Sequence, residues 1–188
     1  MHPLVSFASS RAAPALEGAY ALISGDRRAV RAAKRLAGAL GMRTRSGEGV
    51  DLTAYHAAAW LVAGGTAALG FAARDILLQA GIDHREAEHM LAPLIRSVGD
   101  NVGRIGLPEA LTGVVRRGDV ATLKKHATVL GARSNEHLRL YLACAMAQLP
   151  MARGLNDAPG DALDALQAEL MSQWTALSGP DTLQWERK

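Results

Sequence analysis

Beyond residue 50, every periodic segment of this chain has apolar residues at helical spacing, which argues against a fold dominated by β-sheet. The spacing predicts helices over residues 51–79, 83–105, 119–130, 134–149 and 161–177. The composition agrees with this prediction, because 49% of the residues are hydrophobic while only 4% are aromatic. Alanine, leucine and valine side chains favour close-packed helices over an aromatic-rich β-sandwich.

Residues that begin or end helices stand at the limits of these segments. Asp83 and Asp119 occupy N-cap positions, Ser134 or Asn135 begins the fourth segment, and Gly131 and Pro150 end the third and fourth. Pro93 lies inside the second segment and predicts a kink or break near Ala92. The residues after Gly179 are expected to form a loose tail.

The longest apolar stretch covers residues 57–73 and contains Gly64 and Gly65. It is shorter than the roughly 20 residues of a membrane span. We therefore expect a buried central helix, with the two glycines allowing another helix to approach closely. Since residues 1–10 also lack the pattern of a secretory signal, the sequence predicts a soluble, cytoplasmic protein without membrane contact.

The first 48 residues have a different pattern. Residues 4–7 and 19–24 are predicted strands, residues 26–40 a helix capped by Asp26, and residues 42–45 a further strand. A strand–helix–strand unit favours parallel strand pairing. The glycine-rich loop at 46–49 is the predicted domain boundary. We thus expect a small α/β unit over 1–48, a helical domain over 49–178 and a flexible tail over 179–188, which makes the fold mainly α.

Charge and cysteine content exclude several kinds of partner. The net charge is +3, and the early basic residues have no aromatic neighbours on which bases could stack, so we expect no nucleic-acid binding. The single Cys144 excludes an internal disulfide and a cysteine-only zinc site. His84 and His89 are five residues apart and do not share a helix face as a metal-binding pair would. No metal site is expected.

Four side chains are candidates for a functional site. His56 is in the first turns of a helix and could exchange a proton with a substrate carbonyl or hydroxyl. Arg117 could hold a carboxylate, although the local explanations, a helix cap and a salt bridge, are favoured before the family resemblance is considered. Asn101 could donate an amide hydrogen bond or cap a helix break, and Thr112 stands beside a glycine before the helix that Asp119 caps. From spacing alone, a packed structural histidine is the favoured interpretation of His56.

With these residues identified, the chain resembles a bacterial family that joins a Rossmann domain to a helical module named domain of unknown function 2520. The resemblance is carried by residues 2–7, 55–59, 93–102 and 111–122. It places the chain near 6-phosphogluconate dehydrogenase, ketopantoate reductase and pyrroline-5-carboxylate reductase. It implies that the first 45 residues look like the end of a Rossmann domain, and that His56 faces the cleft with Thr112 and Arg117 near it.

The resemblance implies NAD(P) as cofactor, but the chain has no glycine-rich turn between a strand and a helix that would hold a dinucleotide. It also has Gly64 where the family usually has Asn, and Val114 where it usually has Pro. We therefore expect the C-terminal substrate and dimerisation half of a dehydrogenase-like protein, binding a small carboxylate or carbonyl compound as a homodimer. The alternative is a non-enzymatic dimerisation or ligand-binding module that has lost cofactor binding.

Overall fold

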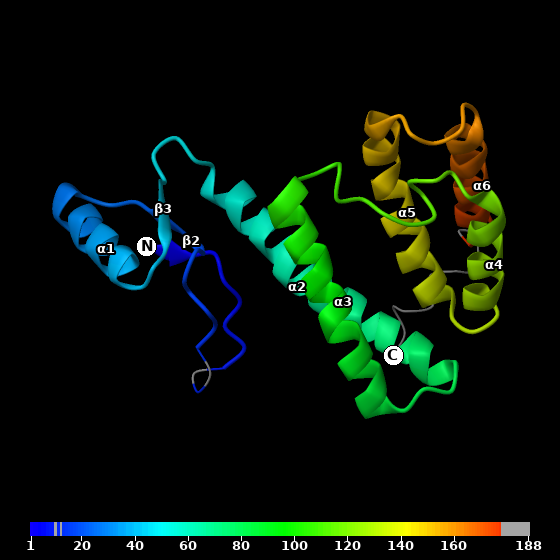
Figure 1. Cartoon of the computed structure of the whole chain (residues 1–188), viewed down its shortest axis with the longest axis horizontal. Helices are drawn as coiled ribbons and strands as arrows, with labels where there is room; N and C mark the ends of the chain where they lie inside the picture. The colour runs from blue at the N-terminus through cyan, green and yellow to red at the C-terminus, as the bar shows by residue number, and fades with distance from the viewer. Residues whose placement is uncertain (10, 12, 178–188) are drawn as a thin grey trace. The chain divides into compact units, whose positions relative to one another are not determined.

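The computed structural model describes residues 1–9, 11 and 13–177, and the predicted tail over 179–188 lies outside them. The fold is mainly α, as predicted, with six helices and a small three-stranded sheet in the described residues (Figure 1). The chain divides into two compact units, Met1–Phe71 and Ala72–Lys188. The division along the chain falls within the long helix α2, Leu52–Gln79. The domain boundary predicted after residue 48 separates a small α/β unit from a helical domain, and it stays a prediction.

The sheet of the first unit has the order β1-β2-β3. Strand β1 covers His2–Pro3, β2 covers Tyr20–Ile23 and β3 covers Arg43–Ser46. Strands β2 and β3 pair in parallel, as the strand–helix–strand pattern predicted, and β1 pairs with β2 antiparallel. Helix α1, Arg27–Ala39, connects β2 to β3, and Ala37 packs with Ala21 and Met42 in a small core.

The strand predicted over residues 4–7 is wrong. The pairing with β2 begins earlier, with His2 opposite Leu22 and Pro3 opposite Ala21. It ends soon after the Leu4 amide donates to the Tyr20 carbonyl at 2.8 Å. Leu4 and Phe7 are exposed, so the apolar pattern at 4–7 does not mark a buried face.

Helix α2 forms over the predicted range, but its predicted burial is wrong. None of its residues is buried, and Trp60, Leu61 and Val62 are 72%, 67% and 71% exposed. No atom lies within 4 Å of a Cβ built on Gly65, and one built on Gly64 would meet only the Trp60 side chain of the same helix. The glycines therefore admit no close neighbouring helix in the described chain.

Helix α2 is long and apolar enough to cross a membrane, by length and composition only. The stretch 57–73 on its own is too short, so the sequence did not predict this. One such helix is weak evidence, because helices of soluble proteins pass the same test. The C-terminal part of α2 carries the charged pair Arg74 and Asp75, whose side chains are 3.0 Å apart.

The second unit is built on helices α4 (Val120–Gly131), α5 (Asn135–Leu155) and α6 (Ala162–Leu177), which pack on one another (Figure 1). Leucines that are fully buried fill the space between the three helices, at about 2 kcal/mol of transfer free energy each: Leu123, Leu142, Leu166 and Leu170. The apolar faces predicted for α4 and α6 are confirmed by this core.

Neither internal proline ends its helix, so a break near Ala92 is wrong, while a kink there stays a prediction. Helix α3, His84–Ile105, continues through Pro93, and α5 continues through Pro150 to Leu155. The end predicted at Pro150 is therefore wrong. A proline removes one backbone donor, but Leu149 and Ala152 on either side of Pro150 are buried in the core. That packing keeps the last turns helical until Asn156, which has a φ of 52°.

The loop before α4 approaches α6 so closely that it needs a glycine. Gly118 has a φ of 63°, and a Cβ built on it would lie 2.6 Å from the Cβ of Ala162. Gly113 in the same loop has a φ of 93°, but no atom lies within 4 Å of its Cβ position. Both glycines have a positive φ that other residues rarely adopt. Only at Gly118 would a side chain also collide with a neighbouring residue.

We predict that Gly118→Ala lowers the free energy of unfolding more than Gly113→Ala. Both variants bear the cost of a left-handed alanine, about 1–2 kcal/mol. Gly118→Ala adds an overpacking cost of about 1–3 kcal/mol. Urea unfolding followed by circular dichroism measures both, and an equal loss in the two variants would show that the contact with Ala162 relaxes without cost.

Candidate functional site

Tyr55 and His56 lie in the first turns of α2, where a capping residue fixes the backbone. The Asp51 carboxylate accepts hydrogen bonds from the amides of Thr53 and Ala54 at 2.9 and 3.1 Å. This cap satisfies amides that have no partner within the helix. The first turns are therefore ordered, and the two aromatic side chains leave them at adjacent positions.

His2 of strand β1 joins these two residues in an aromatic cluster. The His2 ring centroid is 4.8 Å from that of His56 and 5.4 Å from that of Tyr55. The rings of Tyr55 and His56 are 5.7 Å apart. His2 Nδ1 also lies 3.4 Å from the Tyr55 hydroxyl. We call His2, Tyr55 and His56 the histidine cluster.

The histidine cluster combines two imidazoles and a phenol at the surface. His2 and His56 are exposed and Tyr55 is half-buried. Imidazole is the side chain best suited to accept and donate protons near neutral pH. The cluster can therefore exchange a proton with a bound molecule and offer it a hydroxyl. His2 was not a predicted site residue, because a contact with Tyr55 across 53 positions cannot be derived from spacing.

The two arginines before α4 have different surroundings. Arg116 reaches Asp157 with its Nε and Nη2 at 2.8 and 2.6 Å. Its Nη1 donates to the carbonyl oxygens of Glu109 and Leu111 at 3.0 and 2.8 Å. Arg117 is exposed, and its side chain makes no hydrogen bond to other described residues. Arg116 is thus part of the structure of the loop, whereas Arg117 is available to a ligand.

Asp119 is the N-cap of α4, as predicted. Its Oδ1 accepts from the Thr122 amide at 3.0 Å and its Oδ2 accepts from the Thr122 hydroxyl at 2.7 Å. These two bonds, with a smaller contribution from the charge of Arg117, lower the pKa of the Asp119 carboxyl. Asp119 therefore stays ionised and fixed, which leaves the exposed Thr112 and Arg117 as the polar groups of this loop open to a ligand.

Asn101 uses the oxygen of its side-chain amide within its own helix. It lies in α3, and its Oδ1 accepts a hydrogen bond from Arg104 Nη2 at 3.1 Å. A substrate would share the Asn101 amide with this arginine. In the described residues no hydrogen bond joins Asn101 to Thr112 or Arg117. These three residues belong to the second unit, while His56 belongs to the first.

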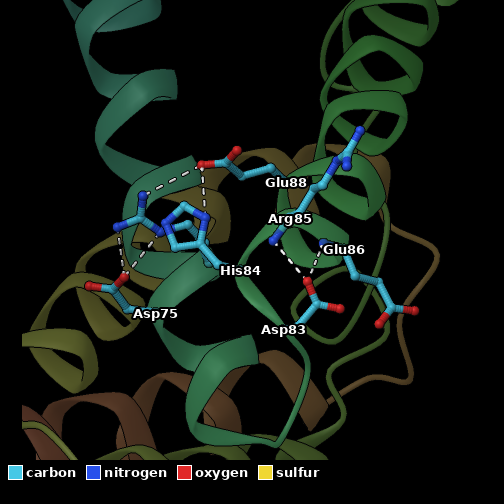
Figure 2. A network of polar contacts seen from close by, with 7 residues as sticks. Asp75, Asp83, His84, Arg85, Glu86 and Glu88 are labelled. Carbon is cyan, nitrogen blue, oxygen red and sulfur yellow. Dashed lines mark hydrogen bonds and ion pairs between the residues drawn. The ribbon is translucent and has the colours of Figure 1, made fainter.

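A charged network connects the end of α2 to the start of α3, as Figure 2 shows. Arg74 contacts Asp75 at 3.0 Å and Glu88 at 3.6 Å, and Glu88 lies 3.7 Å from His84 Nδ1. Asp83 caps α3 by accepting from the amides of Arg85 and Glu86. Within the described part of the chain, no group of His, Cys, Asp and Glu has the geometry to hold a metal ion. This network connects two helices of the second unit.

Comparison with known proteins identifies the family. A family model described as "Domain of unknown function (DUF2520)" matches residues 19–148, which is more than half of the chain. The chain belongs to the DUF2520 family. The matched range contains His56, Asn101, Thr112 and Arg117 but not His2. No curated protein matches the chain.

The fold of this DUF2520 member is similar to that in the crystal structure of protein TM1727 from Thermotoga maritima. The TM-score is 0.64 at 24% sequence identity, over 81% of this chain and 60% of the other. At this identity the likeness supports the fold alone. The chain corresponds to about three fifths of the length of that relative.

We predict that replacing Arg116 and replacing Arg117, in the loop before α4, have different effects on the free energy of unfolding. Arg116→Ala breaks charged hydrogen bonds to Asp157 and to two carbonyls and should lower the free energy of unfolding by about 2 kcal/mol. Arg117→Ala should change it by less than about 0.5 kcal/mol, as expected for an exposed side chain. Urea unfolding of both variants tests this. A loss in Arg117→Ala as large as in Arg116→Ala would show that Arg117 is structural.

Proposed function

We propose that this chain is the C-terminal substrate and dimerisation half of an NAD(P)-dependent dehydrogenase-like protein of the cytoplasm. The observation that carries the proposal is the histidine cluster, which puts His56 at the surface beside His2 and the Tyr55 hydroxyl. The resemblance of the helical domain to that of the 6-phosphogluconate dehydrogenase superfamily supports the same assignment.

In this proposal His56 accepts or donates the proton at a substrate hydroxyl or carbonyl. The rings of His2 and Tyr55 pack against the His56 ring, with centroids 4.8 and 5.7 Å from it, and hold it in place. Thr112 and Arg117 are proposed as contacts for a small carboxylate, because both are exposed and neither is used by the fold. Asn101 would donate its side-chain amide N–H to the substrate, since its bond with Arg104 uses the Oδ1 oxygen.

The residues of the first unit do not fit the pyrophosphate of NAD(P). A dinucleotide needs free amides at the start of a helix that follows a strand. At the β2–α1 junction the Asp26 carboxylate already accepts from the amides of Arg28 and Ala29, both at 2.8 Å. A second anion there would be repelled by this carboxylate. Any nucleotide would have to be held by residues other than these.

The same misfit favours the alternative, a non-enzymatic module that binds a small ligand or a second copy of itself. Both functions share the prediction of a homodimer. Helix α2 has no buried residue, and its centre exposes Trp60, Leu61 and Val62. Large exposed apolar surfaces favour association. Only the proton-transfer role of His56 separates the two functions.

We expect the chain to be a homodimer in which α2 is covered. Leu61→Arg puts a charge on the surface of α2 and should shift the mass in static light scattering towards that of one chain at micromolar concentration. Met171→Arg is the matched control, because Met171 is 50% exposed on α6, another helix. A wild-type monomer, or equal dissociation in both variants, would contradict the use of α2.

The role of His56 is tested by titrating the chain with pyruvate, a small molecule with both a carboxylate and a carbonyl. We expect saturable changes in the proton NMR resonances of His56 and His2. His84 and His89 are exposed histidines outside the histidine cluster and serve as internal controls. NADPH added alone should cause no saturable shift in melting temperature. If His56 responds no more than His84 and His89, the non-enzymatic function is favoured.

A further inference from the structure

A cavity of about 180 Å³ lies in the second unit, between α4, α5 and the loop before α4. Its lining combines apolar side chains with a small number of polar atoms. The lining residues are Val114, Val115, His126, Tyr141, Cys144, Ala145 and Gln148. None of the residues proposed above as proton-handling or substrate-binding lines it, so it is a separate feature of the chain.

One face of α5 forms most of the lining. Tyr141, Cys144, Ala145 and Gln148 follow one another at intervals of three, one and three residues, which aligns them along one side of a helix. Ala145 belongs to the buried core and Val115 is 3% exposed, so the apolar wall is fixed by packing. Ala145 has the smallest side chain of the lining residues.

The polar side chains in the lining are partly ordered. The Tyr141 hydroxyl lies 3.0 Å from His126 Nδ1, and the two rings meet edge to face with centroids 5.7 Å apart. The Gln148 amide makes no hydrogen bond to any other described residue. Burial raises the pKa of the Cys144 thiol and of the Tyr141 hydroxyl, so both stay protonated at neutral pH.

The chemistry of the lining selects a class of ligand. It contains no carboxylate, ammonium or guanidinium group, so a phosphate or other strong anion would lose its hydration without a lysine or arginine partner. An apolar wall with few convergent polar groups is typical of sites for small organic molecules. Cavities of about 150 Å³ are known to hold a benzene ring.

We propose that this cavity binds a small neutral molecule with a flat apolar body and a carboxamide end. The apolar body packs against Val114, Val115 and Ala145. The carboxamide exchanges two hydrogen bonds with the side-chain amide of Gln148, which has both a donor and an acceptor to offer. The site does not depend on the function proposed for the histidine cluster.

Cys144 supplies the test, because it is the single cysteine of the chain and lines the cavity. We would measure the rate at which iodoacetamide alkylates Cys144, by intact-protein mass spectrometry, at increasing concentrations of benzamide. A bound benzamide covers the thiol and should slow alkylation at least threefold at saturation, with a dissociation constant of about 1 mM, as expected for a fragment of this size. Benzoate has the same shape with a charge and should protect at least tenfold more weakly.

Three variants locate the binding. Ala145→Leu fills the cavity and should abolish protection, whereas Ala143→Leu adds the same side chain at an exposed position of α5 and should retain it. Gln148→Leu removes the amide and should weaken protection at least fivefold without filling the cavity. Should Ala145→Leu fail to fold, as judged by its thermal unfolding, Gln148→Leu remains as the test.

Saturation-transfer NMR on the benzamide ring gives a second readout that does not depend on the reactivity of the thiol. Absence of both protection and saturation transfer up to about 10 mM benzamide would overturn the proposal. Equal protection by benzoate, or protection that survives in both Ala145→Leu and Gln148→Leu, would also overturn it, since the molecule would then bind elsewhere.

Discussion

The close approach of the Gly118 backbone to Ala162 constrains how the second unit can fold. It brings the loop before α4 against the start of α6, and Asp119, the next residue, begins α4. The same loop is held from the other side by Arg116, which is bonded to Asp157 and to two backbone carbonyls. The exposed Thr112 and Arg117 are thus presented by a segment whose backbone is fixed at both ends.

The chain uses its polar groups mainly to define where helices begin. Asp26, Asp51, Asp83 and Asp119 each accept backbone amides at the start of a helix. This use has a functional consequence at Asp26, where the capping carboxylate takes the position in which a phosphate group would be bound. The two binding sites proposed for the described residues rely instead on side chains, in the histidine cluster and in the α4–α5 cavity.

Local features of the fold could be predicted from the sequence, while features that depend on distant contacts could not. The caps at Asp83 and Asp119 were predicted because a cap bonds residues within one turn. The end of α5 was misplaced because burial of Leu149 and Ala152 outweighs the effect of Pro150. Burial of α2 was wrongly expected, since an apolar helix does not encode what packs opposite it. His56 was predicted as a candidate, but its neighbour His2 was not, because β1 brings His2 to it from far along the chain.

Helix α2 also contains residues of low helix propensity. Shortly before the boundary between the two units at Phe71, the continuous helix includes Gly64, Gly65 and Gly70. Each glycine costs the helix about 1 kcal/mol relative to alanine. No buried side chain of α2 offsets that cost within the described chain. Backbone amides in this stretch therefore open to solvent and exchange their hydrogens before those of the leucine-packed helices, unless another surface covers α2 and slows them.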